Sequence, residues 1–451
     1  YDFFKKAGFE ITMKPYTATT VLNLDVVLCV VNTCTVTAKA EQKARRIIRL
    51  LLEKCPDAAV LVTGCYAQNN RQEIMSIDKR ICVLGGQYKG HLEDVPQILL
   101  DKNHLFGEEL AHTISKNFDS IYKSAKPFEV QRAFNLVPDD FFHHSRASLK
   151  IQDGCNCVCT YCAIRLARGK SVSLDAQEAV KRVVELEKKG QKEVVITTVN
   201  IAQYKSVWND REIDFCGLLK IFLEKTSTIR FRISSLYPEI VTEELAKVIS
   251  DSRVCEHFHI SVQSGSDKIL QKMKRPYKIS AVYKACELLK KYKKDPFLAC
   301  DIITGFPGES EEDFSCTLKM LNDCGFAFVH AFPFSARPGT QAFDMRPMVP
   351  NSISKKRVEK LEEYNKTAKE NYINRFIGKK LKAICESVHN PKIFADRVII
   401  HAVTQNFLHC QLIFSKNEKI PSAGSLIDVE IRRPLKPQEV TGECDTLAVM
   451  V

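Results

Sequence analysis

Residues 153–162, DGCNCVCTYC, place four cysteines within eight positions. Cys155, Cys159 and Cys162 follow the spacing C-x3-C-x2-C, and Cys157 falls outside it. Such a group of thiols could serve a zinc site, a disulfide pair, a redox dithiol or an iron-sulfur cluster. A structural zinc site usually takes two separated pairs of ligands, and no second pair follows at a suitable interval. Three thiolates can instead hold three irons of a 4Fe-4S cluster and leave the fourth iron open.

The composition limits the class of protein. The chain has 451 residues and 18 cysteines scattered along its length, without a membrane-spanning stretch or a signal-peptide pattern. We therefore expect a cytoplasmic protein with reduced thiols and metal chemistry, and no membrane partner. The formal net charge of +12 favours an anionic partner such as nucleic acid.

The elements that must position these cysteines fall into three regions. Apolar runs that alternate with helical patterns predict a parallel α/β domain over residues 1–125. The polar stretch from about Lys102 to Ser145 indicates a linker with some local structure, which marks a boundary. Six strand-like runs with intervening helical patterns predict a partial (β/α)6 barrel over residues 145–375. Short β-like runs predict a small β-barrel over residues 376–451.

The cysteines follow apolar runs in both α/β regions. The triplet begins directly after ASLKIQ, the first strand-like run of the barrel, at the carboxyl end where βα enzymes build their sites. Cys34 in NTCTVT and Cys65 in TGCYAQ each follow an apolar run of the first domain. In a parallel sheet both would emerge at the same carboxyl edge, which is the usual ligand-binding edge.

Other strand ends supply candidate cofactor contacts. Ser234 and Ser235 end RFRISS, and Gln263 lies at the end of ISVQS. Gly305 and Gly308 in TGFPGE could let the backbone approach a cofactor closely. Helix N-capping would explain the serines equally well, and a tight strand-to-helix turn would explain the glycines. No residue is assigned as a catalytic acid, base or nucleophile.

The basic residues Arg165, Arg168 and Lys170 flank the triplet. They are candidate phosphate contacts, and a solvated basic edge is the alternative interpretation.

Taken together, the motifs resemble the radical S-adenosylmethionine enzymes and, among them, the methylthiotransferases. The resemblance rests on the triplet with Tyr161 and covers essentially the whole chain through NTCTVT, TGCYAQ, RGKS, ISVQSGSDKILQKMKRPY, ITGFPGESEEDF and PFSARPGT. The residues of NTCTVT and TGCYAQ are most similar to those of the branch that acts on threonylcarbamoyladenosine in tRNA. Thr198 departs from the family pattern, which usually has glycine there, and puts one local cofactor contact in doubt.

The resemblance implies two 4Fe-4S clusters and S-adenosyl-L-methionine. Cys155, Cys159 and Cys162 would hold one cluster, with the cofactor on its open iron. The family's second cluster uses three N-terminal cysteines, of which Cys34 and Cys65 would be two. We expect the third upstream of Tyr1, so that the sequence begins inside a longer chain; a defective second cluster is the alternative.

The implied activity is conversion of N6-threonylcarbamoyladenosine next to the tRNA anticodon to its 2-methylthio derivative. The implied partners are the anticodon stem-loop of tRNA, bound through a TRAM-like RNA-binding β-barrel, a reducing electron donor and a sulfur donor. The alternatives are action on isopentenyladenosine in tRNA or on a ribosomal protein aspartate and, from another class, an inactive iron-sulfur RNA-binding protein. The oligomeric state and the role of Cys157 stay unassigned.

Overall fold

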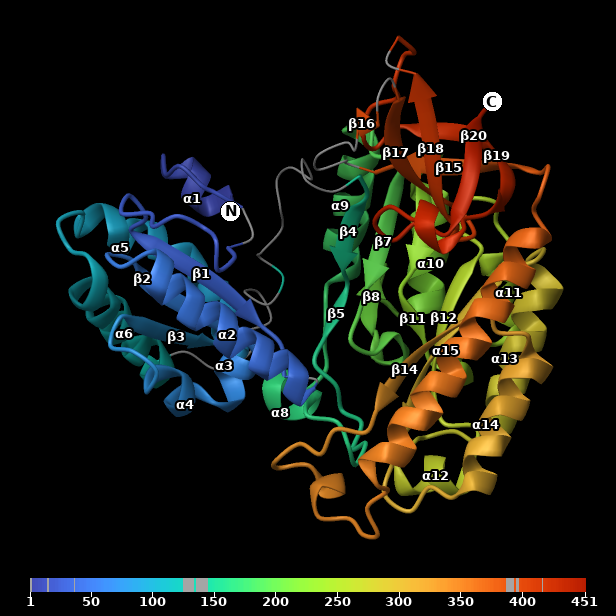
Figure 1. Cartoon of the computed structure of the whole chain (residues 1–451), viewed down its shortest axis with the longest axis horizontal. Coiled ribbons are helices and arrows are strands. Elements are labelled where there is room, and N and C mark those ends of the chain that lie inside the picture. Colours follow the sequence, from blue (N-terminus) through green and yellow to red (C-terminus); the bar gives the residue numbers. More distant parts are fainter. Residues whose placement is uncertain are drawn as a thin grey trace. The chain divides into compact units, whose positions relative to one another are not determined.

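The computed structural model describes residues 2–13, 16–35, 37–124, 134, 145–386, 393–394, 397–415 and 417–451. The chain forms two compact units (Figure 1). The first unit contains Tyr1–Asp139, Asp153–Val172 and Ser335–Asp344. The second unit contains Asp140–Gln152, Ser173–Phe334 and Met345–Val451. The cysteine triplet therefore belongs to the same compact unit as Cys34 and Cys65.

The first unit is built on three parallel strands in the order β1 (Leu28–Thr33), β2 (Ala59–Gly64) and β3 (Ile81–Gly85). One face of the sheet packs against α2 (Ala38–Lys54), α3 (Cys65–Asn69) and α4 (Arg71–Met75), and the other against α5 (Val95–Asp101) and α6 (Gly107–Ser124). Val60 and Val62 point to the α2 face, and Ala59 and Leu61 to the α6 face. This alternation gives the α/β layers that the sequence predicts. The short helix α1 (Asp2–Lys6) precedes them.

Helix α6 forms part of the stretch between Lys102 and Ser145, where the sequence predicts a linker with some local structure. Its polar residues lie outward, and its apolar residues, among them Leu110, Ile114 and Phe118, are buried against the sheet. The sequence indicated only some local structure here, because the composition of the whole segment hides the apolar face of the helix. Most of the remaining stretch lies outside the described residues.

The second unit contains all six strand-like runs that the sequence predicts for the barrel. Two parallel sheets follow the chain order, β4-β7-β10 and β11-β12-β13-β14. The strands are β4 (Ala147–Lys150), β7 (Glu193–Thr197), β10 (Arg230–Ile233), β11 (Ser235–Leu236), β12 (His257–Gln263), β13 (Phe297–Thr304) and β14 (Phe328–Pro333). β10 and β11 come from one run, interrupted at Ser234. The expected partial (β/α)6 architecture is confirmed.

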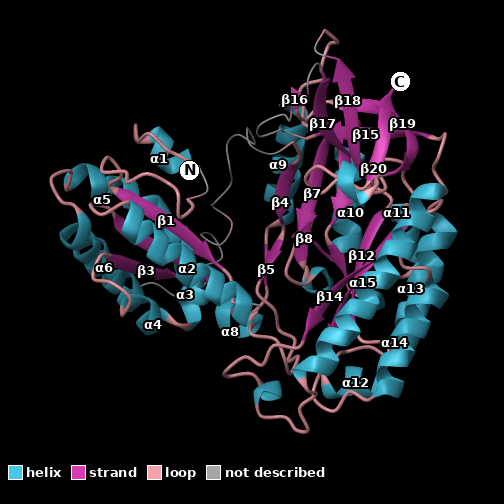
Figure 2. Ribbon diagram, in the orientation of Figure 1, coloured by secondary structure: helices cyan, strands magenta, loops and turns pink. Residues whose placement is uncertain are grey.

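Helices flank these sheets (Figure 2). They are α9 (Ala176–Lys188), α10 (Phe215–Lys225), α11 (Glu243–Ile249), α12 (Asp267–Lys272), α13 (Ile279–Tyr292), α14 (Glu311–Cys324) and α15 (Asn351–Asn374). Shorter elements are β5 (Gln152–Asp153), β6 (Val172–Ser173), α8 (Ile164–Arg168) and the hairpin β8 (Ser206–Trp208) with β9 (Arg211–Ile213).

Helix α15 covers the last strand, β14. The Asn365 side chain accepts a hydrogen bond from the Val329 N–H and donates one to its carbonyl, both at 2.7 Å. These bonds satisfy backbone groups that an edge strand otherwise leaves open. The partial barrel therefore ends on a helix instead of a further strand.

Five C-terminal strands close into a small barrel, as expected from the sequence. They are β15 (Lys380–Cys385), β17 (Arg397–Thr404), β18 (His409–Ser415), β19 (Leu426–Pro434) and β20 (Thr446–Met450), with β16 (Ile393–Phe394) added to β17. The order β15-β19-β20-β18-β17 is closed by the pairing of β15 with β17.

This small barrel shares its hydrophobic core with the βα portion of the second unit. The buried side chains of the barrel strands form one cluster with Phe297 and Ala299 of β13. The Arg232 guanidinium donates hydrogen bonds to the carbonyls of Thr404, at 3.0 Å, and Gln405, at 3.3 Å. The barrel is thus packed against the amino ends of the central strands. The division into domains 1–125, 145–375 and 376–451 stays a prediction.

No helix in the described ranges combines the length and the apolar character needed to cross a membrane.

Candidate functional site

Cys34 and Cys65 lie at the same edge of the first unit's sheet. Thr33, the last residue of β1, pairs with Gly64, the last residue of β2, and each cysteine is the next residue in its chain segment. Neighbouring strands are about 4.8 Å apart, so the two backbones run close together here. A Cβ at Gly64 would overlap the Thr33 carbonyl, so only glycine fits beside Cys65. Cys34 is exposed and Cys65 is buried.

A buried ion pair holds the segment that carries Cys34. The hydroxyl of Thr35, next to Cys34, donates to the carboxylate of Glu41, which also pairs with Arg337. Glu41 and Arg337 are 8% and 7% exposed. Arg337 belongs to the SARPGT motif, whose Ser335 hydroxyl accepts a hydrogen bond from a helix α2 N–H at 3.3 Å. The sequence marks this motif only by resemblance and gives no sign of the ion pair.

The cysteine loop, defined as residues 153–163, is shaped by its own backbone. The Cys155 N–H donates to the Gly169 carbonyl at 3.1 Å, and the Cys162 N–H donates to the Cys159 carbonyl at 3.2 Å. Gly154 has φ +67°, and a Cβ there would overlap the backbone that follows Gly169. These contacts fold the loop back toward the segment that follows α8.

Three thiols of the cysteine loop lie close together. The Cys157 thiol is within hydrogen-bonding reach of the Cys155 and Cys159 sulfurs, and these contacts, together with burial, raise the pKa of Cys157. Within the described ranges, no three Cys, His, Asp or Glu side chains already surround a point where a metal ion would sit. Three soft thiolate donors within one short loop nevertheless fit an iron-sulfur cluster by their chemistry. Their role as ligands stays a prediction.

Arg168, at the end of α8, pairs with Asp153, the residue that opens the cysteine loop. Its guanidinium donates a hydrogen bond to the Asp153 carboxylate at 3.0 Å. Burial lowers the pKa of Arg168, but Asp153 and Cys65 outweigh burial and raise it above its ordinary value. Helix α8 also packs against α3, which begins at Cys65. Arg168 is thus paired within the first unit, and its interpretation as a phosphate contact stays a prediction.

In the second unit, polar groups lie at the carboxyl ends of β7 and β10. The hydroxyls of Thr198 and Ser234 are buried and have no hydrogen-bond partner within the described residues. A buried hydroxyl without a partner is costly, so these groups fit a bound polar ligand such as S-adenosylmethionine. Gln263 ends β12 with φ +70°, an uncommon conformation for a residue other than glycine, and it follows an irregularity in the β12–β13 pairing.

Ser235 takes part in a polar row across adjacent strands. Its hydroxyl lies 2.9 Å from Nδ1 of His259, whose Nε2 lies 3.2 Å from the Asp301 carboxylate. Neither this serine nor Ser234 caps a helix. Both ring nitrogens of His259 therefore have hydrogen-bond partners within the barrel.

Gly305 and Gly308 lie in the turn between β13 and α14, where packing explains both. A Cβ at Gly305 would overlap the Ser354 hydroxyl of α15, and a Cβ at Gly308 would meet the Lys272 ammonium. Both residues also have positive φ, +74° and +78°. The tight-turn interpretation therefore accounts for these glycines, and cofactor contact stays a prediction.

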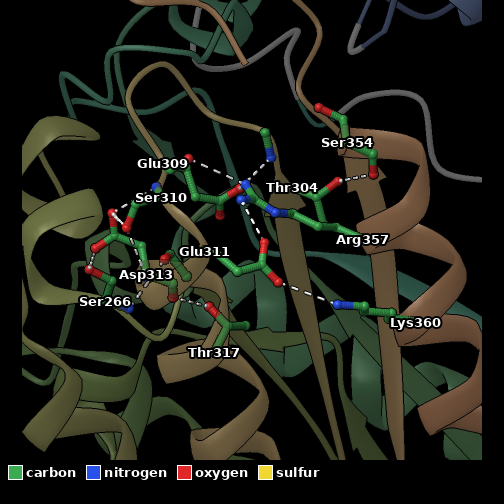
Figure 3. Close-up of polar contacts among 12 residues, drawn as sticks. Ser266, Thr304, Glu309, Ser310, Glu311, Asp313, Thr317, Ser354, Arg357 and Lys360 are labelled. Carbon is green, nitrogen blue, oxygen red and sulfur yellow. Dashed lines mark hydrogen bonds and ion pairs between the residues drawn. The ribbon is translucent and has the colours of Figure 1, made fainter. Parts of the chain in front are cut away.

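The same turn is anchored by a buried carboxylate, Glu309 (Figure 3). Its side chain accepts hydrogen bonds from the Gly305 N–H and from Arg357 of α15, both at 2.5 Å. Burial raises the pKa of Glu309 in spite of Arg357. Arg357 also reaches Glu311, at 3.2 Å. An open hollow of about 420 Å³ beside this network is lined by Glu309, Ser310, Glu311, Ile353, Lys356, Arg357 and Lys360, none of which is a predicted site residue.

Comparison with known proteins first defines the class. Residues 149–321 match the model of the Radical SAM superfamily, and residues 2–86 match that of the Uncharacterized protein family UPF0004. The chain thus has the radical S-adenosylmethionine fold that the βα units and the cysteine loop indicate.

Full-length relatives define the family. The chain is 40% identical over 449 residues to the threonylcarbamoyladenosine tRNA methylthiotransferase MtaB of Treponema pallidum, with 90% of each chain covered. It is 28% identical over 395 residues to the tRNA-2-methylthio-N(6)-dimethylallyladenosine synthase of Photobacterium profundum, with 86% of this chain and 78% of that protein covered. A solved radical S-adenosylmethionine methyltransferase, TsrM from Kitasatospora setae, aligns with a TM-score of 0.48 at 15% identity over 70% of this chain and 66% of that one. The chain belongs to the threonylcarbamoyladenosine tRNA methylthiotransferase family.

Proposed function

We propose that the chain converts N6-threonylcarbamoyladenosine next to the anticodon of tRNA to its 2-methylthio derivative. The observation that carries the proposal is the gathering of Cys34, Cys65 and the cysteine loop in one compact unit of a chain that is 40% identical to an MtaB enzyme over 90% of both lengths. When bound, one 4Fe-4S cluster supplies reductive cleavage of S-adenosylmethionine, and a second carries the sulfur to be inserted.

The residues of the chain have distinct tasks in this proposal. Cys155, Cys159 and Cys162 hold the first cluster, and Cys34 and Cys65 supply two ligands of the second. The buried hydroxyl of Ser234 is available to the cofactor, and Gln263 lies at a neighbouring strand end. The protein's contribution is to hold sulfur, cofactor and base in a productive arrangement.

Substrate and partners follow from the family. The relative that acts on threonylcarbamoyladenosine is more similar to this chain than the dimethylallyladenosine enzyme, at 40% against 28% identity, so we favour the former substrate. Residues 376–451 would bind the anticodon stem-loop, and a reductant and a sulfur donor complete the reaction in the cytoplasm. No observation favours a ribosomal protein aspartate or an inactive protein.

The test uses anaerobically reconstituted protein, reductant, S-adenosylmethionine and tRNA that carries threonylcarbamoyladenosine. We expect Cys159→Ala to lose release of 5′-deoxyadenosine, because the open iron requires all three loop cysteines. Cys34→Ala is expected to retain that release but form no methylthio nucleoside. Cys316→Ala, which replaces an exposed thiol on α14, is the matched control and keeps both activities. Equal 5′-deoxyadenosine release from wild type and Cys159→Ala would refute the assignment.

A further inference from the structure

The polar row of Ser235, His259 and Asp301 crosses three neighbouring strands of the second unit. Because a carboxylate only accepts hydrogen bonds, His259 donates to Asp301 from Nε2, over 3.2 Å, and accepts the Ser235 hydroxyl at Nδ1, over 2.9 Å. This bonding fixes the tautomer of the histidine and directs one oxygen of the Asp301 carboxylate toward its ring. The function proposed above assigns no task to this carboxylate.

The second oxygen of Asp301 has no partner within the described ranges. The bond from His259 goes to Oδ1 alone, and 28% of the Asp301 side chain is exposed. Asp301 shares its face of β13 with Phe297 and Ala299, which lie in the core shared with the C-terminal barrel. The carboxylate therefore continues an apolar face and is open to a ligand that donates a hydrogen bond.

His330 lies beside Asp301 on the last strand, β14. The two residues are partners in the parallel register of β13 and β14, whose backbones are about 4.8 Å apart. The His330 ring packs edge-on against the ring of His259, with 5.3 Å between centroids, and against Phe328 at 4.9 Å. Partial removal from water and the nearby His259 lower the pKa of His330, so its ring is neutral at pH 7.

The nitrogens of His330 have no hydrogen-bond partner in the part of the chain that the structure describes, and the residue is exposed. A neutral imidazole offers one N–H donor and one acceptor nitrogen. An amide or ureido group carries the matching partners, an N–H and a carbonyl, in one planar unit. An apolar group would leave the Asp301 oxygen without a donor, which is unfavourable. The pair of Asp301 and His330 therefore favours an amide-like ligand over an apolar one.

The pair lies inside the carboxyl edge of its sheet. Asp301 precedes the last residue of β13, Thr304, by three positions, and His330 precedes the last residue of β14, Pro333, by the same number. At about 3.3 Å per residue, both lie roughly 10 Å inside the edge where βα enzymes bind their substrates. A base held at that edge can extend a substituent inward to the pair.

We propose that Asp301 and His330 are specificity-determining residues that bind the ureido group of the threonylcarbamoyl substituent, which joins N6 of the adenine to the amino acid. Asp301 accepts an N–H of this group, and His330 donates to its carbonyl. His259 and Ser235 position Asp301 and do not contact the substrate. The inference rests on the proposed function, in which the target base carries this substituent. The substituent's own carboxylate points away from Asp301, because like charges repel.

The experiment measures the binding of anticodon stem-loop RNAs to the full-length holoenzyme. Four RNAs of one sequence carry adenosine, N6-threonylcarbamoyladenosine, N6-methylcarbamoyladenosine or N6-isopentenyladenosine next to the anticodon. We expect the wild type to bind the threonylcarbamoyl RNA about tenfold or more tightly than the unmodified and isopentenyl RNAs. The methylcarbamoyl RNA keeps the ureido group without the amino acid and is expected to retain most of this preference.

Two variants remove the two partners separately. Asp301→Asn keeps an oxygen for His259 but replaces the free acceptor with an amide donor, and is expected to weaken binding of both ureido RNAs about tenfold. His330→Phe keeps a ring and breaks no internal hydrogen bond, and is expected to weaken the same RNAs about fivefold. The matched control is His112→Phe, an exposed histidine on α6, which is expected to stay within about twofold of wild type for every RNA.

The comparison of the four RNAs separates recognition from a structural role. A loss confined to the two ureido RNAs supports the inference. A loss that is equal for all four RNAs shows a defect of the fold in place of recognition and overturns the inference. Equal binding of the four RNAs by the wild type, or an unchanged preference in both variants, also overturns it.

Failure of the proposed function is a distinct result. A wild type that prefers the ureido RNAs but forms no methylthio nucleoside on tRNA that carries threonylcarbamoyladenosine contradicts the function and supports the recognition. A wild type that forms this nucleoside, together with variants that keep the full preference, overturns the inference alone.

Discussion

Glu193 is a buried anion at the start of β7, and its replacement tests how the second unit is held together. Its fully buried carboxylate accepts hydrogen bonds from Arg230 and Arg232, each at 2.7 Å. Burial alone would raise its pKa, but Arg232 and Arg230 together hold the pKa at about 2 instead of the ordinary 4.5. That difference corresponds to about 3 kcal/mol of stability at neutral pH. Removing one partner of a buried pair typically costs about 3–5 kcal/mol, which agrees with this value.

We therefore expect Glu193→Gln to lower the free energy of unfolding of the second unit by about 3 kcal/mol. Fluorescence of Trp208, the single tryptophan of the chain, reports on this unit during urea unfolding. The control is Glu212→Gln, which breaks a pair whose side chains are 72% and 69% exposed and is expected to change stability by less than about 0.5 kcal/mol.

The pH dependence of this difference has a definite sign. Because folding lowers the pKa of Glu193, its contribution is complete above about pH 4.5 and is lost as the pH falls toward 2. The difference between wild type and Glu193→Gln should be constant from pH 8 to about 5.5 and about 1 kcal/mol smaller at pH 3.5. A variant as stable as wild type at pH 7, or an equal difference at pH 7 and pH 3.5, would refute the reasoning.

Three further predictions concern packing and metal content. Gly305→Ala is expected to lower the thermal midpoint of unfolding more than Gly190→Ala. Both glycines have positive φ, but only a Cβ at Gly305 overlaps a neighbour, Ser354. Equal shifts of the midpoint would contradict the packing explanation. Deleting residues 376–451 is expected to destabilise the second unit, because the side chain of Phe297 loses the barrel residues that bury it. Cooperative unfolding at the wild-type midpoint would contradict a shared core. The full-length wild type is expected to bind about eight irons, and a variant with alanine at the three loop ligands about four; stoichiometric zinc without iron-sulfur absorbance would contradict both figures.

Much of the fold follows from periodicity in the sequence. The strand-like runs before Cys34 and Cys65 are short and apolar, and the run before Cys155 alternates apolar and polar residues. Because the carboxyl ends of neighbouring parallel strands lie at one edge of a sheet, Cys34 and Cys65 were expected at the same edge. The sequence did not resolve helix α6 because polar and charged residues outnumber apolar ones in it, although its buried residues recur at helical spacing.

Contacts between residues distant in sequence could not be predicted in this way. Glu41 and Arg337 are 296 positions apart, and nothing in either segment marks a buried charge. The bond from Arg168 to Asp153 depends on how the cysteine loop folds back, which spacing alone does not determine. The small C-terminal barrel was expected, but its shared core with Phe297 is a property of packing and not of periodicity.

The central claim is that the chain adds a methylthio group to threonylcarbamoyladenosine in tRNA. The most direct measurement is mass spectrometry of tRNA nucleosides from a strain in which the gene is deleted, complemented with wild type or with Cys159→Ala. We expect the 2-methylthio-threonylcarbamoyl nucleoside to vanish on deletion while its precursor accumulates, and to return only with wild type. An unchanged level of this nucleoside in the deletion strain, or loss of the methylthio group from the isopentenyl nucleoside alone, would contradict the claim.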